Sequence, residues 1–276
     1  MFQAAAGLAL HLRQGGRLVF DLSRFRAGAA RGYALAPFAL PAEIRPAERG
    51  LVAALRRQVA KRRAPGRPPV PGWWRGPVHV ERGFGHDPAI AALAGDALIA
   101  GYFQSPRYFE DRAEAIAALL DPARLAGPGA AGRAVRLEGE TSVAVHVRRG
   151  DYASGTAGAV HPVLPEAYYI AAAQAVRARV AGARFFVFSD DAAAAAVLAA
   201  RLGDAEPMAG ADAGEDLYLM SRARHHVIAN SSFSWWSAWL DRRPGGMRIA
   251  PRLWFTPAAA ATRPTDDLFP ADWMRL

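Results

Sequence analysis

Residues 141–152 read Thr-Ser-Val-Ala-Val-His-Val-Arg-Arg-Gly-Asp-Tyr, and this stretch decides the fold. Three β-branched valines alternate with smaller or polar residues, a period of two that is typical of a β-strand. Successive side chains of a strand point to opposite faces, so the valines are expected to face the core while His146 and Arg148 share the other face. Gly150 then breaks the predicted strand Val143–Val147.

Two adjacent arginines, Arg148 and Arg149, follow the predicted strand. In open α/β sheets, ligands bind at the carboxyl ends of the strands. A guanidinium stays charged and presents two parallel donors that match phosphate oxygens. The pair therefore indicates an anionic-ligand site. A strand end with solvated arginines is the alternative that these residues alone leave open.

The residues after this stretch alternate between strand-like and helix-like segments, which predicts a parallel, doubly wound α/β sheet. The expected strands are 184–188, 226–229 and 247–250, with a short segment near Met208, and the expected helices are 165–180, 191–202, 215–222 and 232–240. N-terminal to residue 141, the pattern predicts helices over 1–14 and 111–120 and a strand over 17–22. The glycine-rich residues 127–132 mark a boundary between domains 1–130 and 131–276.

Composition limits the class of protein. The chain has 276 residues, 52% hydrophobic and 21% charged, as expected for a folded globular protein. It has no cysteine, which excludes disulfides and thiolate metal sites and favours a reducing, cytoplasmic location. No apolar run reaches the roughly 18–20 residues of a membrane helix. The net charge of +9 comes almost wholly from arginine and leaves nucleic acid, a membrane surface or an anionic substrate open as partners.

A second site is expected in residues 230–236, Asn-Ser-Ser-Phe-Ser-Trp-Trp, where a predicted strand meets the next helix. Ser231 or Ser232 suits the N-cap position. A helix start fed by a parallel strand presents free N–H groups and the positive end of the helix dipole, which suits a phosphate. The alternative is that the serines are caps alone, and the tryptophans are interpreted mainly as core residues. Two anion-suited strand ends in one sheet favour a diphosphate ligand.

Acidic residues follow two further segments. Ser189, Asp190 and Asp191 come after the predicted strand 184–188, where an acidic pair can hold a metal; helix capping by at least one aspartate is favoured, because no Asp-x-Asp pair occurs in this half. Asp216, at a helix start, can accept hydrogen bonds from a guanine edge, or it can simply complement the helix dipole. No P-loop, nucleophile-elbow or zincin motif occurs, which disfavours the corresponding chemistries.

These motifs resemble a known family. Residues 146–152, His-Val-Arg-Arg-Gly-Asp-Tyr, are similar to the His-x-Arg-Arg-x-Asp motif of inverting fucosyltransferases. Residues 216–240, with the long Asn-Ser-Ser-Phe-Ser-Trp-Trp run, resemble the bacterial α-1,2-fucosyltransferases, glycosyltransferase family 11. So do residues 101–109, an aromatic-dense segment polar enough to line a sugar site. The resemblance covers nearly the whole chain and is weakest over 24–82.

The resemblance implies a GT-B-like fold of two Rossmann-like domains. Domain 1–130 would lie on the acceptor side, and domain 131–276 would bind GDP-fucose, with the donor site in its parallel sheet. It implies a galactoside α-1,2-fucosyltransferase that moves L-fucose from GDP-fucose to the 2-hydroxyl of a terminal β-galactose, with inversion. The acceptor would be an oligosaccharide or a lipid-linked glycan. Neither a metal nor another cofactor would be needed, because arginines and a helix N-terminus can stabilise a departing diphosphate.

The resemblance also assigns roles to residues of this chain. Arg148, Arg149 and Asp151 would be catalytic, with Asp151 orienting the arginines. Donor contacts are expected from His146, Arg148, Arg149, Asp216, Asn230, Ser231, Ser232, Phe233 and Ser234. Of these, His146 and Asp216 would recognise guanine. The acceptor-side candidates are Tyr102, Gln104, Ser105 and His161, and no residue is identified as the general base.

Other functions stay open at this point: a relative with another linkage or acceptor, and an inactive glycan- or nucleotide-binding relative. Nucleic-acid binding is disfavoured. We expect a cytoplasmic protein, with peripheral contact to the inner membrane as an alternative. In the family pattern, residues 1–3 follow a first strand and a glycine-rich turn. We therefore expect the N-terminal domain to lack that strand and the natural start to lie upstream.

Overall fold

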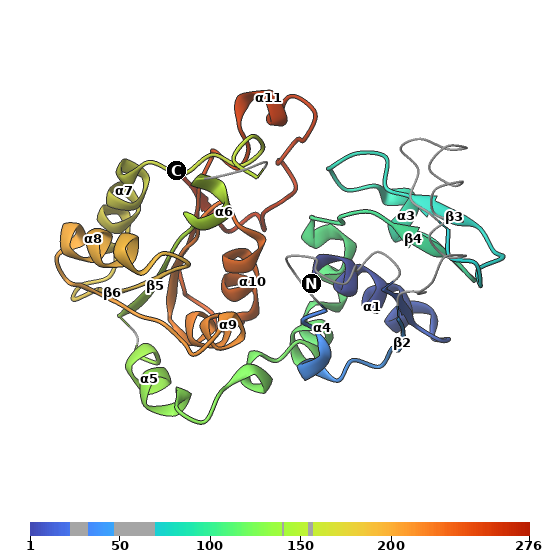
Figure 1. The fold of residues 1–276 in the computed structure, drawn as a ribbon, viewed down its shortest axis with the longest axis horizontal. Helices are drawn as coiled ribbons and strands as arrows, with labels where there is room; N and C mark the ends of the chain where they lie inside the picture. The colour runs from blue at the N-terminus through green and yellow to red at the C-terminus, as the bar shows by residue number, and fades with distance from the viewer. Residues whose placement is uncertain (23–32, 47–69, 140, 154–156) are drawn as a thin grey trace. The chain divides into compact units, whose positions relative to one another are not determined.

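The computed structural model describes residues 1–22, 33–46, 70–139, 141–153 and 157–276. The chain forms two compact units, Met1–Leu119 with Asp266–Leu268, and Leu120–Thr265 with Phe269–Leu276 (Figure 1). The donor and acceptor roles given to domains 1–130 and 131–276 stay predictions. Among the described residues, no helix is both long and apolar enough to cross a membrane.

The first unit combines helices with two small parallel sheets. Its α-helices within the described residues are α1 Phe2–Gln14, α3 Pro88–Ala91 and α4 Ala113–Leu119. Its strands pair as β1 Val19–Asp21 with β2 Glu43–Arg45, and β3 Val78–Val80 with β4 Leu98–Ala100. The predicted helix over 1–14 is confirmed; it ends where Gly15 adopts a φ of 74°, a left-handed conformation that glycine tolerates best.

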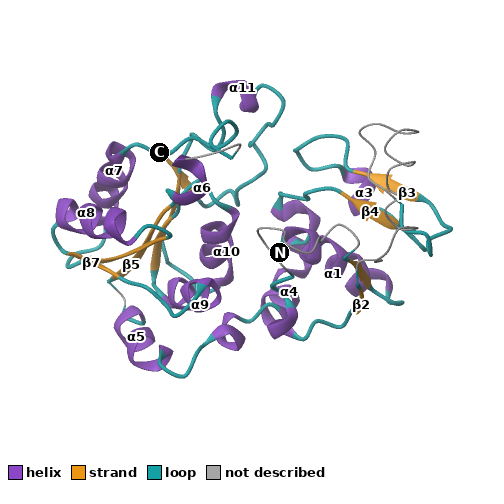
Figure 2. Ribbon diagram, viewed as in Figure 1, coloured by secondary structure: helices purple, strands orange, loops and turns teal. Residues whose placement is uncertain are grey.

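The second unit is built on a six-stranded sheet in the order β10-β9-β8-β5-β6-β7, in which every neighbouring pair is parallel (Figure 2). Its strands are β5 Ser142–Val147, β6 Arg184–Ser189, β7 Ala205–Pro207, β8 His225–Val227, β9 Arg248–Ala250 and β10 Met274–Arg275. Its helices are α5 Ala130–Leu137, α6 Gly150–Ala153, α7 Glu166–Arg177, α8 Ala192–Leu202, α9 Ala213–Arg222, α10 Ser232–Leu240 and α11 Pro257–Ala260. The predicted parallel α/β sheet is confirmed; β10 was not predicted.

The central strand β5 is buried along its whole length. Val143, Val145 and Val147 belong to the core cluster that α7 and α8 cover. Ala144 belongs to the cluster on the other face, under α5 and α9 (Figure 1). The two faces predicted from the alternation are therefore confirmed. Helices cover both faces of the sheet, because the helices that connect parallel strands lie on its two faces.

The strand order reverses at β5. From β5 the chain moves outward through β6 and β7, and it then places β8, β9 and β10 on the other side of β5. In open α/β sheets, ligands bind at the carboxyl ends of the strands where such a reversal occurs. The residues that follow β5 and β8 therefore occupy the position in this sheet that best suits a ligand.

The tryptophan-rich helix α10 is a core element, as predicted. Its three tryptophans, Trp235, Trp236 and Trp239, are buried, and their ring centroids lie 5.1–6.1 Å apart. The helix begins and ends at the residues that the sequence predicts, Ser232 and Leu240. This packing anchors the helix that follows β8 in the core.

Candidate functional site

The arginine pair lies directly beyond β5, at the reversal of strand order. The Arg148 guanidinium forms an ion pair with Asp190, with 3.0 Å between Nη1 and Oδ2. The backbone N–H of Arg149 donates to the other carboxylate oxygen, Oδ1, at 3.0 Å. Asp190 directly follows β6, so one carboxylate joins the carboxyl ends of two neighbouring strands. Only 18% of the Arg148 side chain and 25% of the Asp190 side chain are exposed, which makes this a well-shielded pair.

Gly150 lies against the same carboxylate. A Cβ atom at this position would collide with Oδ2 of Asp190. The glycine after the two arginines therefore leaves room for the Asp190 side chain. The orienting role predicted for Asp151 stays a prediction, because its side chain lies outside the described residues. Sequence reasoning missed Asp190 as the partner of Arg148.

The neighbouring aspartate has the capping role that the sequence favours. Asp191 is the N-cap of α8, and its Oδ1 accepts a hydrogen bond from the Ala194 N–H at 3.1 Å. Among the described residues, no three histidine, aspartate or glutamate side chains come together in an arrangement that could hold a metal ion.

An aromatic stack connects the arginines to the end of β8. The Arg148 guanidinium carbon lies 5.6 Å from the centre of the Tyr152 ring, and that ring stacks on His161 with centroids 5.0 Å apart. The Tyr152 hydroxyl donates to the Asn230 backbone oxygen at 3.0 Å. The Asn230 side-chain Nδ2 in turn donates to the Pro162 backbone oxygen at 2.8 Å. Asn230, predicted to contact the donor, thus ties helix α6, which carries Tyr152, to the loop that carries His161.

The start of α10 provides backbone donors at the same edge. Ser231 is the N-cap, and its Oγ accepts from the Phe233 N–H at 3.3 Å. Ser232 and Phe233 are half-buried. Ser234 is fully buried, and its hydroxyl donates to the Ser231 backbone oxygen, so its side chain serves the helix itself. Of the two N-cap candidates, the structure selects Ser231.

His146 is a neutral buried base beneath the arginines. Its ring is 4% exposed and lies 5.5 Å from the Phe233 ring. Burial lowers the pKa of the imidazole to about 4, and the charge of Arg148 acts in the same direction. Nδ1 is buried and has no hydrogen-bond partner among the described residues. A neutral imidazole can both donate and accept a hydrogen bond, and the nitrogen without a partner is shielded from solvent.

Asp216 lies in the first turn of α9, beyond the carboxyl end of β7. Its Oδ1 accepts from the Gly210 N–H at 2.6 Å. Burial raises the pKa of this carboxyl, and the nearby charges of Asp212 and Glu215 act in the same direction. The helix begins three residues earlier than Asp216, at Ala213, because Asp212 caps it. A half-buried carboxylate with one oxygen committed to a loop can still accept from a ligand with the other.

The remaining acceptor-side candidates lie in the first unit. Ser105 is fully buried, and its Oγ donates to the Asp267 backbone oxygen at 2.8 Å. The Ser105 Oγ also accepts from the Arg107 N–H, so Ser105 caps a short 3₁₀ turn. Gln104 is half-buried and Tyr102 is exposed. His161 belongs to the second unit, so the structure does not bring the four candidates together within one unit.

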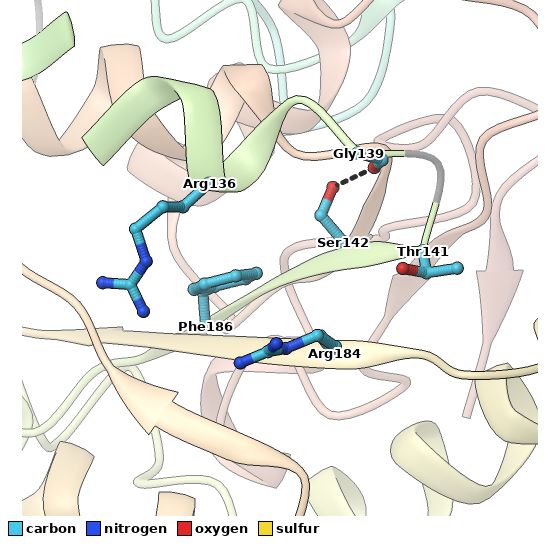
Figure 3. A pocket seen from close by; sticks show the side chains of 6 residues that line it. All are labelled: Arg136, Gly139, Thr141, Ser142, Arg184 and Phe186. Atoms are coloured by element: carbon cyan, nitrogen blue, oxygen red, sulfur yellow. Dashed lines mark hydrogen bonds between the residues drawn. The ribbon is translucent and has the colours of Figure 1, made fainter. Parts of the chain in front are cut away.

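A pocket of about 170 Å³ lies at the opposite edge of the sheet (Figure 3). It is lined by Arg136, Gly139, Thr141, Ser142, Arg184 and Phe186, at the amino ends of β5 and β6. None of the predicted site residues lines it. Its position away from the carboxyl ends of the strands separates it from the candidate site.

The chain is similar to known glycosyltransferases. A family model described as Glycosyl transferase family 11 matches residues 101–276. An α-1,2-colitosyltransferase of Escherichia coli is 36% identical over 169 residues, which cover 59% of this chain and 58% of that protein. The O-antigen biosynthesis glycosyltransferase WbnK of Escherichia coli is 33% identical over 122 residues, which cover 43% of this chain and 40% of that protein. The chain thus spans about half the length of the curated relatives it matches.

Proposed function

Because this chain belongs to glycosyltransferase family 11, we propose that it moves L-fucose from GDP-fucose to the 2-hydroxyl of a terminal β-galactose, with inversion. A glycosyltransferase uses a nucleotide-sugar donor and a glycan acceptor. We assign the donor to the parallel sheet of the second unit, and we interpret the two units as the domains of a GT-B-like enzyme.

The donor assignment rests on two features at the point where the strand order reverses. They are the arginine side chains and the positive end of a helix dipole. Arg148 and Arg149 follow β5, and the capped start of α10 follows the neighbouring β8. When the bond to the sugar breaks, negative charge develops on the leaving diphosphate. Guanidinium groups and backbone N–H groups held in place beforehand stabilise that charge. We propose on this basis that donor activation needs no divalent cation.

In the proposed reaction, the galactose 2-hydroxyl oxygen attacks the anomeric carbon of fucose from the side opposite the diphosphate. The bond between that carbon and the diphosphate oxygen breaks, GDP leaves with the electron pair, and the hydroxyl proton is released. A transition state with oxocarbenium character, like that of glycoside hydrolysis, places most of the demand on the leaving group. In this proposal, the main catalytic contribution is therefore the stabilisation of the leaving diphosphate by the two arginines.

Colitose is the second candidate sugar. The favouring observation is the 36% identity to a protein named for colitosyl transfer. The residues discussed above contact the nucleotide in our proposal, so they do not discriminate between two sugars on the same carrier. Only turnover with each donor separates the candidates.

The test is to incubate the protein with GDP-fucose, or with a nucleotide-linked colitose, and a panel of β-galactosides. GDP release and the linkage of the product are measured, in EDTA and in Mg²⁺. We expect transfer to the galactose 2-hydroxyl at equal rates in both solutions. Transfer that needs Mg²⁺ contradicts metal-free activation, and another linkage contradicts the acceptor assignment. GDP binding without any transfer favours an inactive relative.

A further inference from the structure

Glu81 and the segment that carries Tyr102 lie side by side in the first unit. Glu81 follows β3, and residues 101–103 follow the parallel strand β4, so both lie at the carboxyl ends of paired strands. The Glu81 carboxylate accepts from the N–H of Tyr102 at 2.7 Å and from the N–H of Phe103 at 3.1 Å. The Tyr108 hydroxyl also donates to it, at 2.9 Å. Three donors on one carboxylate make Glu81 a clamp on this backbone.

The clamped backbone is strained. Phe103 has a φ of 53°, in the left-handed region that residues other than glycine rarely adopt. Its ring is buried and meets Tyr108 edge to face, with centroids 5.3 Å apart. At Gly101, a Cβ would lie 2.6 Å from the Cβ and Oε2 atoms of Glu81. An unfavourable backbone conformation persists only where its surroundings enforce it, and such sites are frequently functional.

Tyr102 faces solvent beside this buried ring. Phe103 is 2% exposed, whereas the Tyr102 side chain is 68% exposed. It is the one aromatic side chain in the described part of the chain that is classed as exposed. Two glutamines flank this segment: the Gln3 Nε2 donates to the Gly101 backbone oxygen at 2.7 Å, and Gln104 follows Tyr102 by two residues.

We infer that Tyr102 is a stacking platform for a pyranose ring of the glycan acceptor, an inference that rests on the proposed glycosyltransferase function. The C–H groups on one face of a pyranose pack against an aromatic ring, while its hydroxyls need polar partners at the edge. A tyrosine provides a large, rigid surface at a small cost in side-chain entropy. The neighbouring carboxamides provide both donors and acceptors for sugar hydroxyls. Glu81 is a positioning residue, because it acts on the acceptor only through the backbone of Tyr102 and Phe103.

Steady-state kinetics with a β-galactoside acceptor tests the platform. We expect Tyr102→Ala to raise the acceptor KM by about tenfold, clearly more than the donor KM, whereas Tyr102→Phe, which keeps the ring, stays close to wild type. Glu81→Gln should move the acceptor KM in the same direction, because a carboxamide offers one acceptor oxygen in place of two. Val135→Ala removes an equally exposed apolar side chain in the second unit and should change neither constant.

Direct binding of galactosides, measured by NMR titration of the wild type and of Tyr102→Ala, separates this inference from the proposed reaction. Binding that is lost in Tyr102→Ala supports the platform even if no transfer occurs. An acceptor KM in Tyr102→Ala within about twofold of wild type, or equal galactoside binding by the two proteins, overturns the platform and leaves the donor site untouched. Because the ring is exposed, this variant should fold as the wild type does, with an unchanged Tm.

Discussion

Lowering the pH from 7 to 5 should destabilise the protein through His146. The buried imidazole has a pKa of about 4 in the folded chain, against an ordinary value of 6.5. Below pH 6.5 the unfolded state therefore takes up a proton that the folded state does not, and stability falls until the pH reaches about 4. Each pH unit below 6.5 lowers the free energy of unfolding by about 1.4 kcal/mol, so the loss of stability at pH 5 is about 2 kcal/mol. For a protein of this size, that corresponds to a fall in Tm of roughly 4–8 °C.

Urea unfolding at pH 5, 6 and 7 measures this loss, with His146→Gln compared with the wild type. His86 and His226 also have lowered pKa values, chiefly because of burial. The wild type should therefore lose more stability on acidification than His146 alone accounts for. The free energy of unfolding is plotted against pH for both proteins, and the difference between the two slopes gives the contribution of His146. Phe233→Leu is the control, because it changes the packing beside the imidazole and keeps the titrating group. Equal slopes for the wild type and His146→Gln would refute the buried, neutral state of His146.

Three further predictions concern the donor site. Arg149→Lys should lower turnover on the order of 10²–10³, because an ammonium cannot reproduce two parallel donors to a phosphate; turnover near that of the wild type in initial-rate assays would remove Arg149 from the site. Asp216→Ala should weaken GDP binding in calorimetry and leave ADP binding nearly unchanged, because adenine lacks the donors of the guanine edge; equal losses would make Asp216 a support for the Gly210 loop alone. Gly150→Ala should lower both Tm and GDP affinity, because its Cβ displaces the Asp190 carboxylate from Arg148; a Tm within about 1 °C of wild type would contradict this.

The elements of the second unit could be predicted well from the sequence. Alternating valines indicated β5 and its two faces, and α10 has the predicted bounds, 232–240. The caps Ser231 and Asp191 were among the expected residues. These signals are local. A capping hydrogen bond spans two or three residues, and the period of a strand or helix is visible within a short segment of sequence. The two-residue β10 is too short to carry a period, which explains why it was missed.

The sequence by itself also predicted the residue types of the candidate site, because two arginines and a serine-capped helix start suit a diphosphate if the fold brings them to one edge of a sheet. Only the tertiary structure decided where these residues lie and which of the candidates support the fold. It paired Arg148 with Asp190, buried Ser105 and Ser234, and revealed Glu81 as the clamp behind Tyr102. Arg148 and Asp190 are 42 positions apart in the chain, and they meet because β5 and β6 are neighbours in register. Strand order and register depend on the packing of the whole core, and no local pattern in the sequence encodes them.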